Sequence, residues 1–452
     1  MAARFTATEV RRVLGLSEIA MSGSFTSVST DTRDLQPGAL FVALQGDRFD
    51  GTDFVMEAER LGAAGAVIPA LAGEPPVDLT LFSVDDTTVA LGDLARYHRQ
   101  RCEARVVGVT GSSGKTTVKE MLVRTISPER RVHATVGNLN NQVGLPLSIL
   151  AASDDTEVWV LELGASEPGE IRRLTSIAEP DDAVVTTVGP AHLEGLGDIT
   201  GVLEEKLDLV RGASRSGSVV VGELPEMLPE QAREIRDDVV TAGLGSRCDF
   251  RPAEWSLGPT EARFRHEGTD YSVPVGGEHH LRDALIATAM AMAMGVGPAA
   301  IARGLAEYRP VGMRGALVEV GELTIVADCY NANPESFEAA IRYCADSFPG
   351  RRLGVVAGTM LELGPAEASA HADVAIALLD SGFSLIVAVG AFQIAFESMQ
   401  VPADVEVVYA ERVEAVSDLL ADRLDGSEVL LVKGSRGVRL ERVIDDLVGG
   451  SG

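Results

Sequence analysis

Residues 105–117 of the chain read RVVGVTGSSGKTT. The first part, Arg105–Thr110, is a β-branched, apolar run that favours a buried strand. A glycine-rich turn interrupts this run, and a segment with the apolar spacing of a helix follows it. The turn and the start of the helix comprise Gly111, Ser112, Ser113, Gly114, Lys115, Thr116 and Thr117.

A strand, a glycine loop and a helix in this order are the setting of a phosphate-binding loop. Backbone N–H groups of such a loop and the positive end of the helix dipole face the polyphosphate. We expect Lys115 to reach the terminal phosphates and the hydroxyl of Thr116 to bind Mg²⁺. Val109 stands where the strict pattern has glycine, so this is the shorter form GxxGKTT. A tight turn with a chance lysine is the alternative interpretation.

The composition indicates a chain of several globular domains. A length of 452 residues with 46% hydrophobic content predicts about three domains, each with its own core. The net charge of −28 argues against nucleic acid and anionic membranes as partners. The four cysteines lack CxxC spacing, which indicates neither a zinc site nor a disulfide framework. A reducing cytoplasm is therefore the expected location.

Two segments could be mistaken for targeting or membrane signals. The opening MAARFTATEVRRVLG is charged and predicts an amphipathic helix with a threonine cap, not a signal peptide. Ala284–Ala302 is uncharged and long enough for a membrane span, but Gly295, Gly297 and Pro298 interrupt it. We therefore expect a buried helix followed by a turn, and no membrane insertion.

Alternating strands and helices predict an α/β protein of three domains. Residues 1–102 are expected to form a small N-terminal α/β domain, 103–310 a central domain with a mostly parallel sheet, and 311–452 a doubly wound, Rossmann-like domain. The expected strands are 39–44, 66–69, 106–110, 158–163, 183–188, 218–221, 239–244, 323–327, 353–357, 385–389, 405–409 and 429–432. A hairpin is expected within residues 263–275.

Lysine is rare in this chain. Four of the 39 basic residues are lysines, namely Lys115, Lys119, Lys206 and Lys433. Arginine is permanently charged whereas lysine can lose its proton and react, so each lysine is a candidate for a site. Lys206 lies on the apolar face of a predicted helix, together with Leu203 and Leu207. The alternative is a lysine whose stem covers this face while its charge stays in water.

Polar residues follow several predicted strands, at the edge where a doubly wound sheet binds ligands. Glu162 ends the strand before LGASEPGE, a position suited to holding Mg²⁺ beside a phosphate loop. His192, in GPAHLEG, follows the next strand. Further polar residues after strand ends are expected to line a cleft, namely Asn138, Asn140, Asn141, Tyr330, Asn331, Asn333 and Lys433. In the first domain, Ser29–Arg33 and Gln45–Gly51 predict either a ligand site or two solvated turns.

Together these motifs resemble the Mur ligase family over nearly the whole chain. STDTR and FVALQGDRFDG resemble its uridine-binding N-terminal domain. GSSGKTT, GNLNNQVGLP, ELGASEPGEI and VGPAHLEG resemble its central ATPase domain, and DCYNANPES, GTMLELG and VKGSRG its C-terminal domain. The YNANP stretch, without a DNPR signature, favours the member that adds a dipeptide over the member that adds the third residue.

The resemblance implies an ATP- and Mg²⁺-dependent ligase that joins D-alanyl-D-alanine to UDP-N-acetylmuramoyl-tripeptide in peptidoglycan synthesis. It implies catalytic roles for Lys115, Lys206 and His192. Thr116 and Glu162 are implied to hold one Mg²⁺, and His192 with a carbamylated Lys206 a second. Nucleotide contacts are implied for the phosphate loop, His280, Asp283, Arg314 and Asp328. Uridine contacts are implied for Thr32, Arg33, Arg48 and Phe49, and the cleft residues named above are assigned to substrate binding.

The chain departs from the family pattern in places. The family often has asparagine where this chain has His280 and Asp283, and aspartate where it has Thr359, which is assigned no role. Three alternatives stay open: the third-residue-adding member, a folylpolyglutamate synthase, which lacks the STDTR domain, and a nucleotide-binding scaffold without ligase activity. We expect the protein to be a monomer.

Overall fold

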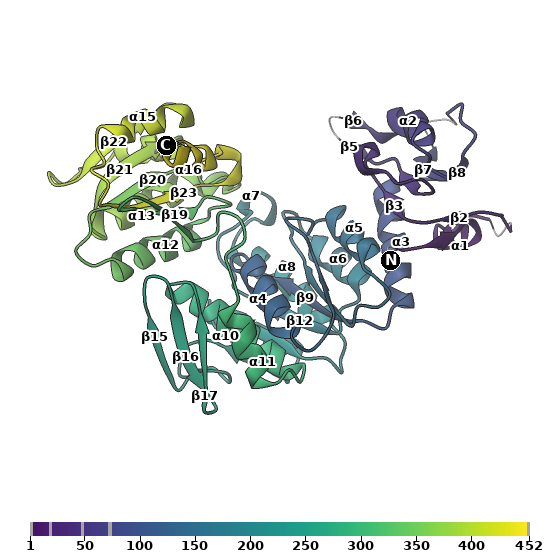
Figure 1. Ribbon diagram of the computed structural model, residues 1–452, viewed down its shortest axis with the longest axis horizontal. Coiled ribbons are helices and arrows are strands. Elements are labelled where there is room, and N and C mark those ends of the chain that lie inside the picture. The colour runs from purple at the N-terminus through teal and green to yellow at the C-terminus, as the bar shows by residue number, and fades with distance from the viewer. Residues whose placement is uncertain (1–2, 18–19, 47–48, 71–74, 450–452) are drawn as a thin grey trace.

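The computed structural model describes residues 3–17, 20–46, 49–70 and 75–449. Figure 1 shows an N-terminal unit in purple and a C-terminal unit in yellow-green on opposite sides of a central unit. Each unit is built on its own main sheet with helices against it. The α/β class expected from the sequence is confirmed.

The N-terminal unit is a small α/β unit. Its elements are β1 (Phe5–Thr6), α1 (Ala7–Val13), β2 (Ser24–Phe25), β3 (Val28–Ser29), β4 (Leu40–Val42), β5 (Gln45–Gly46), β6 (Phe49–Asp50), α2 (Val55–Arg60), β7 (Gly65–Pro69), β8 (Thr80–Val84) and α3 (Thr87–Arg101). Its main sheet is parallel, in the order β3-β4-β7-β8. The expected threonine cap is present, because Thr6 and Glu9 form a capping box at the start of α1.

The central unit carries a sheet of parallel strands. Its elements are β9 (Arg105–Thr110), α4 (Lys115–Ile126), β10 (Val132–Ala134), α5 (Gly144–Ala151), β11 (Val158–Glu162), α6 (Glu170–Ala178), β12 (Asp182–Val185), α7 (Leu193–Leu196), α8 (Ile199–Gly212), β13 (Val219–Gly222), α9 (Met227–Ile235), β14 (Val239–Ala242), β15 (Glu254–Leu257), β16 (Ala262–His266), β17 (Thr269–Val273), α10 (Glu278–Ala293) and α11 (Pro298–Ala306). The sheet order is β10-β11-β9-β12-β13-β14.

This sheet is covered on both faces, which explains its continuous apolar strands. Every residue of β11 and β12 is buried, as a parallel sheet between two helical layers requires. Helices α4, α10 and α11 pack on one face, and α3, α5, α6 and α8 on the other. Strand β9 lies between β11 and β12, and the helices that follow β9 and β11 go to opposite faces. Open α/β sheets bind ligands at such a point, beyond the carboxyl ends of the strands.

Some expected elements of the central unit differ from the structure. The hairpin within 263–275 is part of a three-stranded antiparallel sheet, whose first strand β15 was not expected. All four residues of β15 are exposed, so its sequence carries no alternation of buried and exposed positions. Strand β12 ends at Val185 and not at Val188, and the residues between them enter the loop before His192. The uncharged run 284–302 forms the end of α10 and the start of α11, separated at Gly295. Among the described residues, no helix has the length and apolar character needed to cross a membrane.

The C-terminal unit has a mixed sheet, in the order β18-β19-β23-β20-β21-β22. Its elements are β18 (Ala316–Val320), β19 (Leu323–Asp328), α12 (Pro334–Ser347), β20 (Leu353–Ala357), α13 (Glu367–Asp380), β21 (Phe383–Val389), α14 (Ala391–Glu397), β22 (Glu406–Ala410), α15 (Val416–Ala421), β23 (Val429–Lys433) and α16 (Glu441–Gly449). The antiparallel edge strand β18 was not expected. A tight turn with Gly321 at a positive φ joins it to β19.

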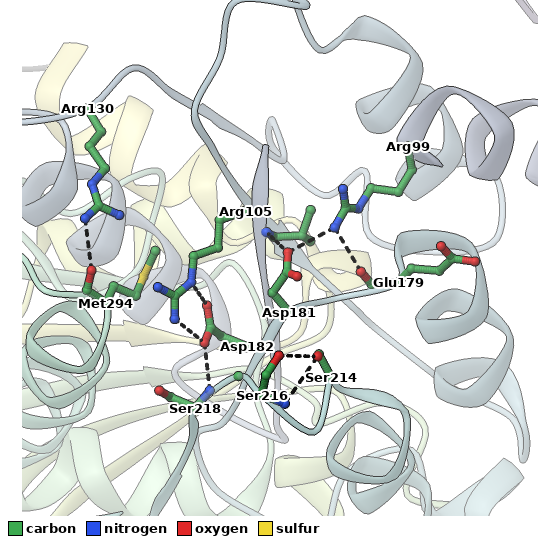
Figure 2. Close-up of polar contacts among 12 residues, drawn as sticks. Arg99, Arg105, Arg130, Glu179, Asp181, Asp182, Ser214, Ser216, Ser218 and Met294 are labelled. Carbon is green, nitrogen blue, oxygen red and sulfur yellow. Dashed lines mark hydrogen bonds and ion pairs between the residues drawn. The ribbon is translucent and has the colours of Figure 1, made fainter. Parts of the chain in front are cut away.

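Two adjacent aspartates tie strands of the central sheet together at the end opposite the phosphate loop (Figure 2). Asp182 is fully buried and accepts hydrogen bonds from Nε of Arg105 at 2.6 Å and from the backbone N–H of Ser218 at 2.8 Å. Asp181 accepts from the backbone N–H of Val106 at 2.8 Å and from Arg99 at 3.0 Å. The pair therefore links the starts of β9, β12 and β13, and connects them to α3.

We predict that Asp182→Ala lowers the free energy of unfolding of the central unit by about 2–3 kcal/mol, because the Ser218 N–H and a partly exposed guanidinium lose their acceptor. Asp182→Asn keeps one acceptor oxygen and should cost less. Both tryptophans, Trp159 and Trp255, lie in the central unit, so denaturation followed by tryptophan fluorescence reports on this unit. Glu157→Gln, at a half-exposed ion pair, is the control and should change stability by less than about 0.5 kcal/mol. Equal effects of Asp182→Ala and the control would contradict the prediction.

Candidate active site

The phosphate loop connects β9 to α4 through two glycines with positive φ. Gly111 has φ +150° and Gly114 has φ +79°, a left-handed value at the N-cap of α4. A Cβ at Gly111 would lie 2.0 Å from Oγ1 of Thr186, and one at Gly114 would lie 2.4 Å from Oδ1 of Asp283. Side chains therefore fit at neither position, and the turn requires glycine for both space and conformation.

Lys115 folds back over this loop. Its Nζ donates hydrogen bonds to the carbonyl oxygens of Gly111 at 2.7 Å and Ser112 at 3.3 Å. Burial lowers the pKa of Lys115, Glu162 opposes this shift, and Arg314 adds to it. Phosphate oxygens at the loop would offer the amine stronger, charged acceptors than these carbonyl groups. The expected position of Lys115 at the phosphates is therefore available in the structure.

Glu162 is the centre of a polar cluster beside the loop. Its Oε2 accepts a hydrogen bond from the Thr116 hydroxyl at 2.8 Å, and its Oε1 accepts from Nδ2 of Asn140 at 2.8 Å. The Glu162 backbone N–H donates to the hydroxyl of Thr135, which fixes the end of β11. A buried carboxylate next to a hydroxyl is a donor set that suits a hard cation such as Mg²⁺.

His192 begins the short helix α7 in a left-handed conformation, with φ +54°. Its loop is tied to the phosphate loop, because the Ser112 hydroxyl donates to the Gly189 carbonyl at 3.0 Å and accepts from the Gly189 N–H at 2.9 Å. Across the cleft, Oε2 of Glu362 lies 2.5 Å from Nδ1 of His192. Glu362 belongs to the C-terminal unit, so the two units meet at this histidine.

Lys206 is buried in the core of the central unit. Only 1% of its surface is exposed, so the alternative of a lysine with its charge in water is wrong. Burial and, to a lesser extent, nearby Lys115 lower the pKa of Lys206 to about 7, against the opposing effect of Glu205 and Glu170. Both carboxylates are already occupied by backbone N–H groups, with Glu205 accepting from Gly169 and Ile171, and Glu170 from Ser166 and Glu167. The amine therefore has little to hold its proton at neutral pH.

A cleft of about 610 Å³ brings most of the expected residues together, between the central and C-terminal units. Its walls include Ser112, Ser113, Gly114, Lys115, Thr116, Thr117, Asn138, Asn140, Asn141, Glu162, His192, His280, Asp283, Arg314, Asp328, Tyr330, Asn331, Asn333 and Lys433. Asn141 also fixes the turn before α5, since its Oδ1 accepts from the backbone N–H of Gly144 at 2.8 Å. The sequence-based expectation of a cleft lined by strand-end residues is thus met in the structure.

The C-terminal wall of the cleft contacts the phosphate loop directly. Asn333 caps α12 with its Oδ1, and its Nδ2 donates to the Ser113 hydroxyl at 3.2 Å. Nζ of the buried Lys433 donates to Oδ2 of Asp328 at 2.6 Å, at the carboxyl ends of β23 and β19. Two arginines lie over the Tyr330 ring: Cζ of Arg314 is 3.5 Å from the ring centroid, and Cζ of Arg436 is 4.9 Å from it. The wall thus presents cations toward the phosphate loop.

Glu335 and His279 line the cleft and were not expected from the sequence, whereas their neighbours Asp283 and His280 were. Burial raises the pKa of Glu335 and of Asp283, and the negative charge of Glu335 raises the pKa of Asp283 further. The His279 ring lies tilted against the His280 ring with centroids 4.1 Å apart, and burial lowers the pKa of both imidazoles. Glu335 is the second residue of α12, directly after the Asn-Pro start signal, and that position was the available clue.

Other expected residues lie elsewhere. Thr32, Arg33 and Phe49 belong to the N-terminal unit, and Arg33 forms an ion pair with Asp31 at the surface. Arg48 lies outside the described residues.

Lys119 is buried and donates to the Thr135 carbonyl at 2.7 Å, which makes it a support for the loop after β10. Thr359 also supports the local structure, because its hydroxyl accepts a hydrogen bond from the backbone N–H of Ala391, at the start of α14.

One group of metal-compatible side chains lies outside the cleft. Among the described residues, His98, Cys102 and Asp154 have ligand atoms within 4.8 Å of one another. Nε2 of His98 already contacts the Ala152 carbonyl at 3.3 Å, and the imidazole stacks on Trp159. Burial lowers the pKa of His98 and raises that of Cys102, so both are neutral and suited to packing where α3 ends.

A phosphate loop, an adjacent carboxylate and a second α/β unit across the cleft are the parts of a nucleotide-dependent enzyme. Family models match the chain in three stretches: "Mur ligase family, catalytic domain" over residues 24–99, "Mur ligase middle domain" over 109–291, and "Mur ligase, glutamate ligase domain" over 313–436. The chain belongs to the Mur ligase family.

Individual relatives match over nearly their whole length. The UDP-N-acetylmuramoyl-tripeptide–D-alanyl-D-alanine ligase of Bacillus subtilis is 34% identical over 428 residues, which cover 93% of both chains. The crystal structure of MurF from Acinetobacter baumannii is 29% identical, with a TM-score of 0.90 and coverage of 99% of both chains. MurF from Thermotoga maritima, solved in complex with ADP, is 30% identical, with a TM-score of 0.82 and coverage of 94% and 97%.

We predict that Lys115→Ala lowers kcat for ATP-dependent phosphate release by about a hundredfold or more, because the cation that offsets charge on the transferred phosphate is lost. Circular dichroism and tryptophan fluorescence should match the parent, since Lys115 contributes hydrogen bonds only within its own loop. Phosphate release near the parent rate would rule out this loop as the site of phosphoryl transfer.

Proposed function

We propose that this chain joins D-alanyl-D-alanine to UDP-N-acetylmuramoyl-tripeptide at the expense of ATP, in peptidoglycan precursor synthesis. The proposal rests on one observation: the GSSGKTT loop and the YNANP and KGSRG stretches form facing walls of the same cleft. The YNANP stretch is the part of the chain that favours the dipeptide-adding member over the member that adds the third residue. The dipeptide and the end of the tripeptide would meet there, beside the γ-phosphate.

The residues of the cleft support a two-step reaction. The terminal carboxylate of the tripeptide attacks the γ-phosphorus of ATP, ADP leaves, and an acyl phosphate forms. The neutral amine of D-alanyl-D-alanine then attacks the acyl carbon, phosphate leaves, and the amine loses a proton as the amide forms. Lys115 and the N-terminus of α4 hold the phosphates in place and offset their charge during transfer. Arg314 and Lys433 lie on the opposite wall, where they can orient the anionic reactants.

The donor chemistry of the cleft fits Mg²⁺ as cofactor. Thr116 and Glu162 would hold one ion, and His192 with a carbamylated Lys206 would hold a second. When bound, Mg²⁺ offsets negative charge on the phosphates and on the transition state. The resemblance to the family assigns nucleotide contacts to four further residues that line the cleft, namely His280, Asp283, Arg314 and Asp328.

The N-terminal unit is assigned to the uridine diphosphate end of the substrate. Its candidate residues Thr32, Arg33 and Phe49 lie in the unit that Figure 1 places away from the C-terminal unit. A UDP-linked peptide is long enough to extend from one unit to the cleft. The domain limits 1–102, 103–310 and 311–452, a monomeric state and a cytoplasmic location stay predictions.

A phosphate-release assay tests the proposed function against its alternatives. Phosphate release should require ATP, Mg²⁺, UDP-N-acetylmuramoyl-tripeptide and D-alanyl-D-alanine together. Two matched reactions test the alternatives. In one, a single amino acid replaces the dipeptide and the shorter UDP-muramoyl acceptor replaces the tripeptide. In the other, glutamate is supplied with a folate acceptor. Release in either of these arms alone would favour the third-residue-adding member or a folylpolyglutamate synthase. Binding of ATP without release in any arm would favour a scaffold.

We predict that Lys206→Ala loses nearly all activity and that acetate partly restores it by filling the vacated space. Burial lowers the pKa of Lys206 to about 7, so the neutral amine that adds CO₂ predominates above this pH and is lost below it. Lys206→Arg cannot lose its proton and should stay inactive with acetate. With ¹³C-labelled bicarbonate, a carbamate NMR signal should appear in Lys115→Ala and be absent in Lys206→Ala. Ligation by Lys206→Arg at the parent rate would exclude the carbamate.

A further inference from the structure

Glu362 is the residue of the C-terminal unit that reaches His192. Its Oε2 lies 2.5 Å from Nδ1 of His192, and the backbone N–H of Glu194 donates to its carbonyl oxygen at 3.3 Å. Two residues further on, a Cβ at Gly364 would lie 3.1 Å from Cα of Glu194, so the two backbones are in close contact. The contact therefore involves the carboxylate, the main chain and the packing of both loops.

Both partners are held in uncommon backbone conformations. His192 has φ +54° and Glu362 has φ +65°, and non-glycine residues adopt such values at a cost that the surrounding structure must offset. The two side chains approach each other from these fixed backbone positions, with Oε2 of Glu362 2.5 Å from Nδ1 of His192.

The loop that carries Glu362 is fixed within its own unit. The N–H of Leu361 donates to the Ser435 hydroxyl at 3.0 Å, and the N–H of Met360 donates to Nε2 of the buried His371 at 2.9 Å. On the other side, the loop that carries His192 is fixed to the phosphate loop through Ser112 and Gly189. Movement of the C-terminal unit therefore moves Glu362 relative to His192 and the phosphate loop.

The chemistry of the pair depends on which nitrogen the carboxylate occupies. A carboxylate beside Nδ1 favours a proton on that nitrogen, which leaves Nε2 as the nitrogen that can bind a cation. Carboxylates that hold one ring nitrogen in this way orient histidine ligands and strengthen the other nitrogen as a ligand. Glu362 thus selects the form of His192 that can bind a cation, and it does so when the two units are together.

We propose that Glu362 is a positioning residue that prepares His192 for its cation when the C-terminal unit closes on the phosphate loop. This inference rests on the proposed function, because the cation is the second Mg²⁺ assigned there. If Glu362 has this role, the second Mg²⁺ site is complete only when the C-terminal unit lies against the phosphate loop. In that arrangement the walls that hold the two substrates also face the phosphates.

The test compares Glu362→Ala with Glu362→Gln, which keeps an oxygen that can accept from Nδ1. The control is Glu194→Ala, which removes an exposed carboxylate from the His192 loop but keeps the backbone N–H that donates to Glu362. Binding of Mn²⁺ is measured by electron paramagnetic resonance with a non-hydrolysable ATP analogue present, and the Mg²⁺ dependence of phosphate release is measured in parallel. Thermal unfolding midpoints establish that all variants fold.

We expect Glu362→Ala to weaken the second Mn²⁺ site by about 10- to 100-fold and to raise the half-saturating Mg²⁺ concentration similarly. Glu362→Gln should recover a large part of this loss, and KM for ATP at saturating Mg²⁺ should stay close to the parent value. Unchanged Mn²⁺ binding in Glu362→Ala, or an equal loss in Glu194→Ala, would overturn the proposal. A parent protein that shows the Glu362-dependent site but releases no phosphate would support this proposal and overturn the proposed function.

Discussion

The turn between β9 and α4 is the constraint on which the rest of the structure depends. Two glycines with positive φ let the chain leave a buried strand and enter a helix while its N–H groups face a cleft. Asp283 and Thr186 approach Gly114 and Gly111 so closely that no side chain fits between them. Elements from both ends of the central unit therefore pack onto the loop, and the sheet order that places β9 between β11 and β12 brings Glu162 and His192 to the same edge.

Much of this site could be predicted from the sequence because its signals are local. The phosphate loop directly follows its strand, and Glu162 ends a second apolar strand, so each of these signals is contained within a few residues. The scarcity of lysine was a second signal, since Lys119, Lys206 and Lys433 are all buried and Lys115 lies in the phosphate loop. Lys119 shows the limit of this signal, because it supports the fold through the Thr135 carbonyl. Of the four lysines, Lys115 and Lys433 are among the residues that line the cleft, and the buried Lys119 and Lys206 are not.

What could not be predicted depends on contacts between distant parts of the chain. The edge strands β15 and β18 have exposed or half-buried faces, so their sequences lack the apolar pattern of the central strands. The contact between His192 and Glu362 joins positions far apart in the sequence and on different units. The link from Asn333 to Ser113 is similar: the sequence placed Asn333 in the wall of a cleft, but not the distant residue to which its side chain donates.

The electrostatics of the cleft explain how a chain with a net charge of −28 can suit anionic substrates. Exposed charges beyond about 8–10 Å are screened at physiological salt, so the excess of acids over the surface has little effect inside the cleft. Within it, Lys115, Arg314 and Arg436 act at short range, where low solvent access strengthens each interaction. Asp283 and Glu335 are acids in the same cleft, and their negative charge would repel phosphate. Burial raises the pKa values of both carboxyl groups and so reduces this negative charge. The balance of charge at the phosphates is therefore set by a few desolvated side chains, and the composition of the whole chain does not determine it.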